Sequence, residues 1–378
     1  MAAVAAWLCV PWAAATMGRV AHVAVEGLVG SAVLVDWMPW LTRRLAPPPP
    51  LAVALYYASV LTLLALTPRS PAASIVRNAA RPIAAVVFAS CAFWIVAAPP
   101  GVSWARSRPL RVTFLDVGQG DSVIVQFPNG RTLSIDAGGA ASSFDIGARV
   151  VSPAFWALGV RRLDYMTITH GDADHIGGAS SLFRDFRPFE VWEGVPVPPH
   201  GPTRELRALA DASGATWRTL QPLDRASVGA VDLLVHHPPK PDWERQRVRN
   251  DDSEVLEIRY GDVSFVFTGD VGREVERAIA PGFVRAPIRI VKVPHHGSAT
   301  SSSPIFLDAL GPDVAVIGAG RGNPFGHPVP AVLARYRAMG AAIYRTDLDG
   351  AVTVETDGTT VRVGTFLGRR LTLTTYGR

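Results

Sequence analysis

The sequence predicts an α/β (α+β) protein, in which two mixed sheets covered by helices form an αβ/βα sandwich after an all-α apolar segment. Two observations support this class. The first 98 residues hold only eight charged side chains, six arginines and two acids. A soluble segment of that length would carry roughly three times as many at the usual charged fraction of about 25%. From Pro99 onwards, β-rich runs alternate with helical patterns.

Three apolar stretches make up the front segment, at residues 2–40, 51–66 and 82–98. A helix that crosses a bilayer needs about 20 apolar residues. We therefore expect about three transmembrane spans over residues 1–98, with 47–50 and 68–82 as loops, in a multi-pass protein of the cell membrane. A secretory signal peptide fits poorly because no basic residue precedes Ala2. Core helices of a soluble protein are an alternative for the shorter stretches.

The rest of the chain divides into a linker at 99–110, a globular domain at 111–366 and a C-terminal tail at 367–378. Asn129–Gly130 marks a hairpin turn. The expected strands are 111–114, 122–126, 131–136, 165–169, 231–235, 254–259, 263–268, 288–293, 314–318, 342–345 and 351–355. The expected helices are 177–186, 204–212, 273–280, 303–310 and 330–339.

Charge and cysteine content exclude some classes of protein. The formal net charge is +5, but the front segment contributes +4 of it, so charge gives no support to a nucleic-acid-binding face on the domain. Both cysteines lie in apolar stretches, which excludes a disulfide framework in the domain.

The run T-H-G-D-A-D-H, residues 169–175, places His170, Asp172, Asp174 and His175 between a predicted strand and a predicted helix. Alternate residues there project into one cavity, and imidazole with carboxylate is a ligand set for Zn²⁺ or Mn²⁺. A capped polar loop would need two histidines and two acids at these offsets by coincidence. The sequence therefore predicts a metal site.

More polar residues follow later predicted strands: Asp270 in F-T-G-D, His295 and His296 in K-V-P-H-H-G-S, and His327 in F-G-H-P. One such residue alone is more often structural. Their repeated position after strands adds them to the predicted site.

The run H-G-D-A-D-H resembles the HxHxDH signature of the metallo-β-lactamase superfamily, with Asp172 at the second histidine. Together with F-L-D-V-G-Q-G-D-S (114–122), I-D-A-G-G (135–139) and the later motifs, it resembles the ComEC family of DNA-uptake channel proteins of naturally competent bacteria. Family members have more membrane helices and an earlier extracytoplasmic domain, so this chain resembles a C-terminal fragment or a truncated product. The superfamily usually has a further histidine ligand where this chain has residues 250–253, Asn-Asp-Asp-Ser.

The resemblance implies two divalent metal ions, Zn or Mn, bridged by Asp270 and a hydroxide that acts as the nucleophile. One ion would be held by His170, Asp172 and Asp270, and the other by Asp174, His175, Asp270 and His327. Asp136 and Gln119 would support these ligands. The expected catalytic residues are Asp121, Asp174, His295 and His296, although either histidine could instead be a ligand or a phosphate contact. The expected substrate contacts are Ser122, Lys292 and Ser298, although a strand-end lysine is often only solvated.

Three functions remain open. The resemblance favours a nuclease that acts on DNA, in single-stranded form, on the extracytoplasmic face, with other competence or channel subunits as partners. A hydrolase of a small phosphodiester is the second, because this fold accepts many substrates. A DNA-guiding domain without catalysis is the third.

Overall fold

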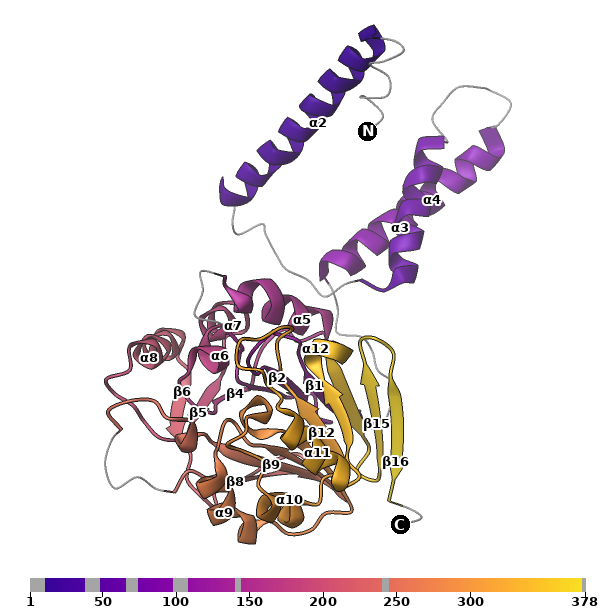
Figure 1. The fold of residues 1–378 in the computed structure, drawn as a ribbon. Coiled ribbons are helices and arrows are strands. Elements are labelled where there is room, and N and C mark those ends of the chain that lie inside the picture. The colour runs from indigo at the N-terminus through magenta and orange to yellow at the C-terminus, as the bar shows by residue number, and fades with distance from the viewer. Residues whose placement is uncertain are drawn as a thin grey trace. The chain divides into compact units, whose positions relative to one another are not determined.

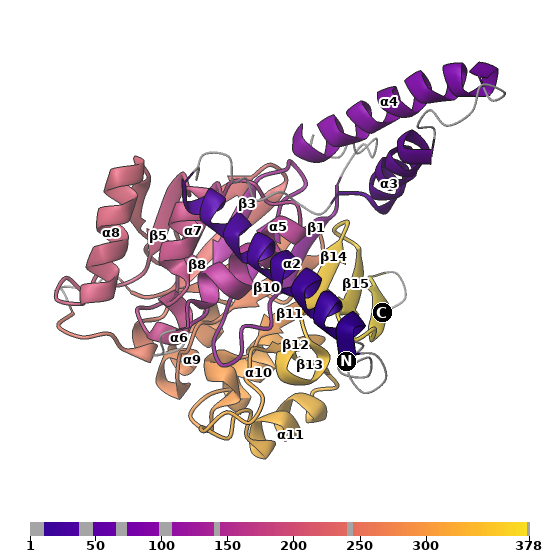
Figure 2. The same ribbon diagram turned by 90° about the horizontal axis from the view of Figure 1, so that it is seen from above.

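The computed structural model describes residues 11–37, 48–65, 74–97, 108–139, 144–239 and 245–375. The chain forms two compact units, Met1–Ala98 and Pro99–Arg378. Each unit is described below by itself (Figures 1 and 2).

The smaller unit is helical, as the sequence predicts. It contains α2 (Pro11–Trp37), α3 (Pro50–Ala65) and α4 (Ser74–Ala97). Helices α3 and α4 pack together, with the Tyr56 and Phe88 rings 5.1 Å apart. Residues 74–82, expected in a loop, belong to α4, which contains Pro82.

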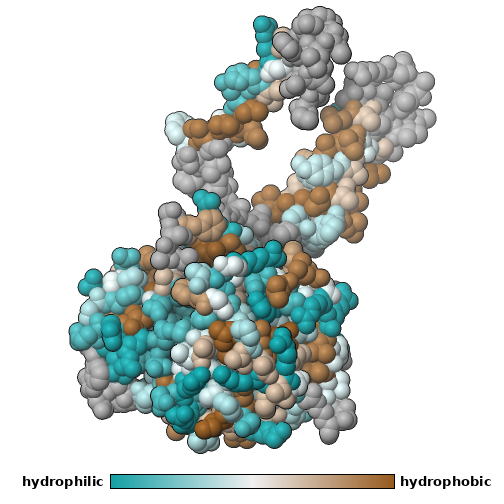
Figure 3. Space-filling view, viewed as in Figure 1, coloured by the Kyte–Doolittle hydropathy of each residue, from teal (hydrophilic) through white to brown (hydrophobic). Residues whose placement is uncertain are grey.

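None of the helices that the structure describes is both long enough and apolar enough to cross a membrane. The three predicted spans therefore find no support in these helices. Helix α3, for example, has 16 residues, fewer than the roughly 20 that a bilayer requires. The described side chains of the three helices are nevertheless mostly apolar, whereas the visible face of the larger unit is mainly hydrophilic (Figure 3).

Two facing sheets form the larger unit. The nine-stranded sheet has the order β16-β15-β14-β1-β2-β3-β4-β5-β6. Its strands are β1 (Leu110–Phe114), β2 (Val123–Gln126), β3 (Thr132–Ile135), β4 (Tyr165–Ile168), β5 (Glu190–Glu193), β6 (Thr216–Thr219), β14 (Val352–Thr356), β15 (Thr360–Thr365) and β16 (Arg370–Thr374).

The seven-stranded sheet has the order β13-β12-β11-β10-β9-β8-β7. Its strands are β7 (Arg225–Val228), β8 (Val231–His237), β9 (Val255–Tyr260), β10 (Val263–Phe267), β11 (Ile288–Lys292), β12 (Val314–Ile317) and β13 (Ala342–Arg345). The helical segments are η3 (Gly147–Val151), α5 (Ser152–Ala157), α6 (Ala173–Ile176), α7 (Ala179–Phe186), α8 (Gly201–Ser213), η4 (Asn250–Asp252), α9 (Arg273–Ile279), η5 (Ala280–Gly282), η6 (Pro294–Gly297), α10 (Pro304–Leu310), α11 (Pro330–Ala338) and α12 (Thr346–Asp349).

The main core lies between the sheets. Alternate strand residues point inward from both sides, so that Phe114 of β1 stacks with Phe267 of β10 at 6.0 Å. Helices α5, α7 and α8 cover the outer face of the larger sheet. Helices α9, α10 and α11 cover the outer face of the smaller one (Figure 1). This arrangement confirms the predicted αβ/βα sandwich.

Five strands, β5, β6, β7, β15 and β16, are missing from the sequence prediction. Strand β6 is mostly exposed, so it lacks the apolar run that marks a buried strand. Strand β16 pairs along its length with β15, so residues 370–374 are part of the sheet, and a tail beginning at 367 was wrong. Leu110, expected in the linker, starts β1 and is fully buried; residues 99–107 lie outside the described residues.

The site is positioned by strand direction. Strands β10, β11 and β12 are parallel to one another, as are β3 and β4. Parallel strands bring the residues that follow their carboxyl ends to a common edge. Asp270, His296 and Gly318 follow the first group, and Asp136 and His170 follow the second.

Candidate metal centre

The loop after β4 that carries the signature motif is held in place by the backbone. Asp121 N–H donates to the Asp174 carbonyl at 3.1 Å, and Ala137 N–H donates to the His175 carbonyl at 2.7 Å. Gly120 adopts a φ of +130°, and a Cβ there would lie 2.2 Å from the Asp174 carbonyl oxygen. Only glycine permits this approach. Gly120 of the Q-G-D-S motif therefore allows the loop after β1 to pack directly against the signature loop at residues 170–175.

Four side chains converge beside this loop. His175 Nε2 lies 3.4 Å from one carboxylate oxygen of Asp270, and His296 Nε2 lies 3.4 Å from the other. His296 Nε2 is also 3.3 Å from Asp174 Oδ2. Ligand atoms about 2.1 Å from a tetrahedral metal ion lie about 3.4 Å apart. The spacing of these atoms therefore suits a divalent metal.

Unsatisfied nitrogen atoms support the same fit. The Nε2 atoms of His170, His175 and His296 are buried, and none has a hydrogen-bond partner within the residues that the structure describes. A buried polar atom without a partner is costly and calls for an explanation. A bound cation would provide the missing partner.

The far nitrogen of each converging histidine is anchored. His175 Nδ1 lies 2.7 Å from Asp136 Oδ2, and His296 Nδ1 lies 2.9 Å from the Gly318 carbonyl. Asp136 also accepts hydrogen bonds from Thr169 N–H at 2.8 Å and from its hydroxyl at 2.7 Å. A donor hydrogen at Nδ1 directs the lone pair of Nε2 towards a metal. Both anchors therefore suit a metal-binding tautomer.

Charge in this cluster shifts several pKa values. Burial favours neutral His296, but Asp270 and Asp121 outweigh it and raise the pKa of His296 to about 9. Burial similarly opposes charge on Asp174, yet the His296 imidazole, whose Nε2 lies 3.3 Å from Asp174 Oδ2, and the charge of His175 lower the pKa of Asp174 to about 2. The same partners hold the pKa of Asp270 well below its usual range. The carboxylates are therefore ionised at neutral pH, as metal ligands must be.

Asp121 also belongs to this cluster, since Asp121, His175, Asp270 and His296 each offer an atom within 4.8 Å of the others. However, Asp121 faces the Nδ1 atoms of His175 and His296, at 3.9 and 3.8 Å. Those atoms point away from the place where the Nε2 atoms meet. Asp121 is thus better placed to support the histidines than to bind a metal with them.

Lys292 was expected to contact substrate, but the structure encloses it beside two carboxylates. Its side chain is buried, and its ammonium pairs with Asp121, lies 3.3 Å from Asp270 Oδ1 and donates to the Gly269 carbonyl at 2.8 Å. Burial would lower the pKa of Lys292, but Asp121 and Asp270 raise it to about 12. Lys292 therefore remains charged and offsets the negative charge of both carboxylates.

The other two expected substrate contacts are also buried. The Ser122 hydroxyl has no hydrogen-bond partner within the described ranges, and it lies beneath the surface. The Ser298 hydroxyl lies 3.1 Å from that of Thr300. Gln119, expected to support a ligand, instead accepts a hydrogen bond from Gly320 N–H at 3.3 Å and joins two loops.

His327 was expected to be a ligand together with Asp174, His175 and Asp270, but it does not lie among them. The structure puts His296 against Asp174 and Asp270, whereas the His327 ring lies 5.7 Å from that of His295 and 5.9 Å from that of Phe325. His295 and His296 both adopt left-handed φ values, 50° and 53°. This rare backbone conformation in two successive residues decides which imidazole enters the cluster.

A second group of possible ligands lies alongside. His170 Nε2 is 3.3 Å from Asp172 Oδ2, and the His170 and His175 rings are 4.2 Å apart. His295 Nε2 lies 3.9 Å from Asp270 Oδ2 and 3.2 Å from the Asn250 amide nitrogen. Sequence reasoning did not give Asn250 a role, although it marked 250–253 as the place of the missing histidine. Nothing in the sequence pointed to Thr169 or to the Gly318 carbonyl.

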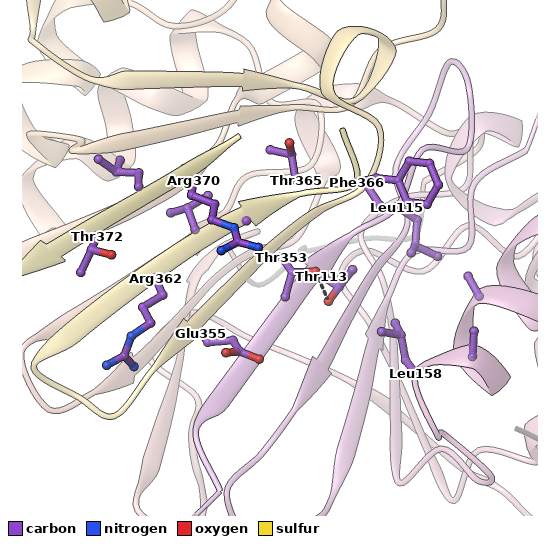
Figure 4. Close-up of a pocket in the computed structure, with 16 residues that line it drawn as sticks. Thr113, Leu115, Leu158, Thr353, Glu355, Arg362, Thr365, Phe366, Arg370 and Thr372 are labelled. Atoms are coloured by element: carbon purple, nitrogen blue, oxygen red, sulfur yellow. Dashed lines mark hydrogen bonds between the residues drawn. The ribbon is translucent and has the colours of Figure 1, made fainter. Parts of the chain in front are cut away.

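A pocket of about 410 Å³ opens onto the centre. It is lined by Asp270 and His295 together with Arg249, Asn250, Asp251, Gly272, Arg273, Glu274 and Thr300. A larger groove of about 800 Å³ lies on the outer face of β1, β14, β15 and β16 (Figure 4). On its floor, the hydroxyl groups of Thr113 and Thr353 form a hydrogen bond of 3.1 Å. No predicted site residue lines this groove, so the smaller pocket is the candidate entrance for substrate.

Comparison with known proteins agrees with this geometry. Residues 115–321 match the metallo-beta-lactamase superfamily. The chain belongs to that superfamily, whose fold indicates a metal-dependent hydrolase.

Particular relatives are competence proteins. The chain is 31% identical over 270 residues to ComE operon protein 3 of Bacillus subtilis, covering 68% of this chain and 34% of that protein. It is 29% identical over 347 residues to competence protein ComA of Neisseria gonorrhoeae, covering 85% of this chain and 47% of that protein. These matches confirm the resemblance to ComEC-type proteins, and the chain spans between a third and a half of their length.

Among solved structures, the chain is similar to the metallo-beta-lactamase fold protein YhfI from Bacillus subtilis. The TM-score is 0.42 at 14% identity, with 63% of this chain and 96% of that chain covered.

Proposed function

We propose that this chain is a metal-dependent phosphodiesterase that cleaves the DNA backbone during DNA uptake by competent cells. The main support is the convergence of Asp174, His175, Asp270 and His296 beside an arginine-bearing pocket. The competence proteins among the relatives supply the cellular context.

We assign Asp174, His175, Asp270 and His296 as ligands of one divalent ion, Zn or Mn. His170 and Asp172, with Asp270, are the ligands proposed for a second. A bound divalent ion lowers the pKa of water towards about 7 and polarises a phosphoryl oxygen.

The remaining residues orient these groups. Asp136 and the Gly318 carbonyl fix the two imidazoles, and Lys292 with Asp121 sets the charge behind them. Burial lowers the pKa of His295, so His295 is neutral at pH 7. A neutral imidazole on the wall of the pocket can accept a proton from water or donate a hydrogen bond to a phosphate oxygen. It is less suited to be the acid for the leaving group.

The first 98 residues, in our proposal, attach this hydrolase to the cell membrane, with the larger unit on the extracytoplasmic face. The support for attachment is their low charge and the apolar side chains that α2 exposes, such as Leu28 at 73%. The orientation is the one that the resemblance to ComEC-type proteins implies. The full chain should then fractionate with membranes and resist carbonate extraction. Recovery in the soluble fraction would contradict this part of the proposal, as well as any role beside channel subunits.

The catalytic proposal is tested with the purified full chain and added Mn²⁺ or Zn²⁺, using single-stranded DNA, duplex DNA and a small phosphodiester. Asp270→Asn should abolish DNA cleavage even at saturating DNA. Asp211→Asn, at an exposed position on α8, is the matched control and should cleave normally. Cleavage of the small phosphodiester alone would favour a different substrate. DNA binding without any hydrolysis would favour a guiding role.

A further inference from the structure

The turn between β15 and β16 presents two apolar side chains to solvent. Phe366 is 82% exposed, and Leu367 is 60% exposed. The turn packs against the end of α12, where Leu367 N–H donates to the Asp349 carbonyl at 3.2 Å, and Leu348 of this helix is itself 58% exposed. Residues 348, 366 and 367 are called the apolar tip below. Folding gains little from apolar side chains in water, so three of them grouped at one turn indicate a contact surface.

The backbone of this turn is fixed. Gly368 N–H donates to the Thr365 carbonyl at 3.0 Å, and Thr365 N–H donates to the Arg369 carbonyl at 3.0 Å. The Arg369 guanidinium donates to both carboxylate oxygens of Asp349 at 2.8 Å. A built turn therefore holds the apolar side chains outward.

Arginines line both hollows that adjoin the apolar tip. Arg362 and Arg370 line the groove on the outer face of β14, β15 and β16 together with Phe366 (Figure 4). Arg337 of α11 lines a second hollow of about 370 Å³ together with Leu348. All three arginines are exposed, so their charges are available at the surface.

The acids in these hollows already have partners. Glu355 in the groove pairs with Arg111 at 2.6 Å, and Asp349 in the second hollow pairs with Arg369 at 2.8 Å. The guanidinium groups of residues 337, 362 and 370 have no carboxylate partner among the residues that the structure describes. The surface around the apolar tip therefore combines exposed apolar side chains with uncompensated positive charge.

We infer that the apolar tip inserts between the headgroups of an anionic phospholipid bilayer and that the three arginines pair with lipid phosphates. Binding of this kind strengthens with the apolar area buried and with the attraction to anionic lipid. A nucleic acid would also pair with the arginines, but Leu348 and Leu367 offer it no hydrogen bond and no aromatic face. The docking site is separate from the metal centre, and it adds a contact by the larger unit to the attachment proposed for the first 98 residues.

The test asks whether the apolar tip touches lipid in the full chain. The two cysteines are removed by Cys9→Ser and Cys91→Ala, and Leu367→Cys then carries an environment-sensitive fluorophore. The labelled chain is reconstituted in phosphatidylcholine vesicles with and without phosphatidylglycerol, whose acyl chains carry bromine as a quencher. Emission should shift to the blue and be quenched, and both changes should be larger with phosphatidylglycerol.

Val284→Cys is the matched control, because this side chain between η5 and β11 is 64% exposed. Its label should show neither change. Arg370→Gln should lower the ratio of docked to free apolar tip about fivefold, since an arginine near an anionic surface loses its attraction to the lipid. Arg161→Gln removes an exposed arginine that precedes β4 and should leave the ratio unchanged.

Quenching at position 367 that is no stronger than at 284 would overturn the inference. A blue shift without quenching would mean that protein covers the apolar tip, and quenching that ignores phosphatidylglycerol would remove the role of the arginines; either result also overturns it.

Vesicle flotation separates this docking site from the proposed attachment. The wild type is compared with a Phe366→Ser/Leu367→Ser variant whose thermal melt is unchanged. Flotation that requires the intact apolar tip would support the docking site and refute attachment by the first 98 residues. Flotation of both proteins without quenching at 367 would refute only the docking site, and no flotation of either would refute both.

Discussion

Replacing Asp136 with asparagine tests how the centre selects its histidine tautomer. Asp136 Oδ1 accepts a hydrogen bond from Thr169 N–H, and Oδ2 faces the Thr169 hydroxyl and His175 Nδ1 at 2.7 Å each. An asparagine that keeps its oxygen on the backbone N–H must turn its amide nitrogen towards His175. Nδ1 then becomes the acceptor, and the proton moves to Nε2, which can no longer bind a metal.

The expected cost follows from this exchange. Loss of a group that orients a ligand histidine lowers metal affinity about 10–100-fold, which corresponds to about 1.4–2.7 kcal/mol. The assay is competition for Zn²⁺ or Mn²⁺ with a chromophoric chelator at constant pH, with a thermal melt of the metal-free protein alongside.

Asp164→Asn is the matched control. Asp164 precedes β4 and accepts a hydrogen bond from Thr132 N–H at 2.9 Å, so it also holds backbone, but it touches no histidine in the described ranges. It should alter the melt without altering metal affinity. A folded Asp136→Asn protein with wild-type metal affinity would refute the tautomer argument, because the substitution leaves every proposed ligand in place.

Three further predictions concern the ligands, their protons and the fold. His296→Gln should remove more bound metal than His327→Gln, as measured by elemental analysis, and equal losses would restore the expectation from sequence. Because the pKa of His296 is raised to about 9, a metal ion must displace the proton of this imidazole in order to bind. The apparent affinity for metal should therefore rise up to about tenfold per pH unit between pH 6 and 8. Metal affinity that does not change with pH in calorimetric titrations would count against this. Arg289→Met should lower the free energy of unfolding by about 3–5 kcal/mol, because it leaves Glu257 buried beside one fewer cation. Arg259 is a more exposed partner of the same carboxylate. Arg259→Met should therefore lower the free energy of unfolding, measured in urea, by less than Arg289→Met does. Burial opposes ionisation of Glu257, but hydrogen bonds from His236, Arg259 and Ser264 lower the pKa of Glu257 to about 2. The stabilisation is therefore complete above the unfolded pKa and is lost as the pH falls towards 2.

The local pattern of the sequence determined a large part of the structure. Strands and helices of the core were predictable because their apolar period reflects burial on one face. Residues 170–175 were predictable as a cluster because six consecutive residues at the end of a strand cannot lie far apart. The hairpin at Asn129–Gly130 followed from turn chemistry alone.

Only the tertiary structure decided which distant groups meet. Whether His296 or His327 joins Asp174 and Asp270 depends on two left-handed residues after β11, and no spacing in the sequence encodes that turn. The burial of Lys292 was equally unpredictable from the sequence, because a lysine at the end of a strand reaches water in most folds. Here β11 lies between β10 and β12 in the smaller sheet, and its last side chain is enclosed beside Asp121. A local sequence pattern specifies the period and the ends of an element, whereas the partners of a side chain depend on how elements far apart in the chain pack together.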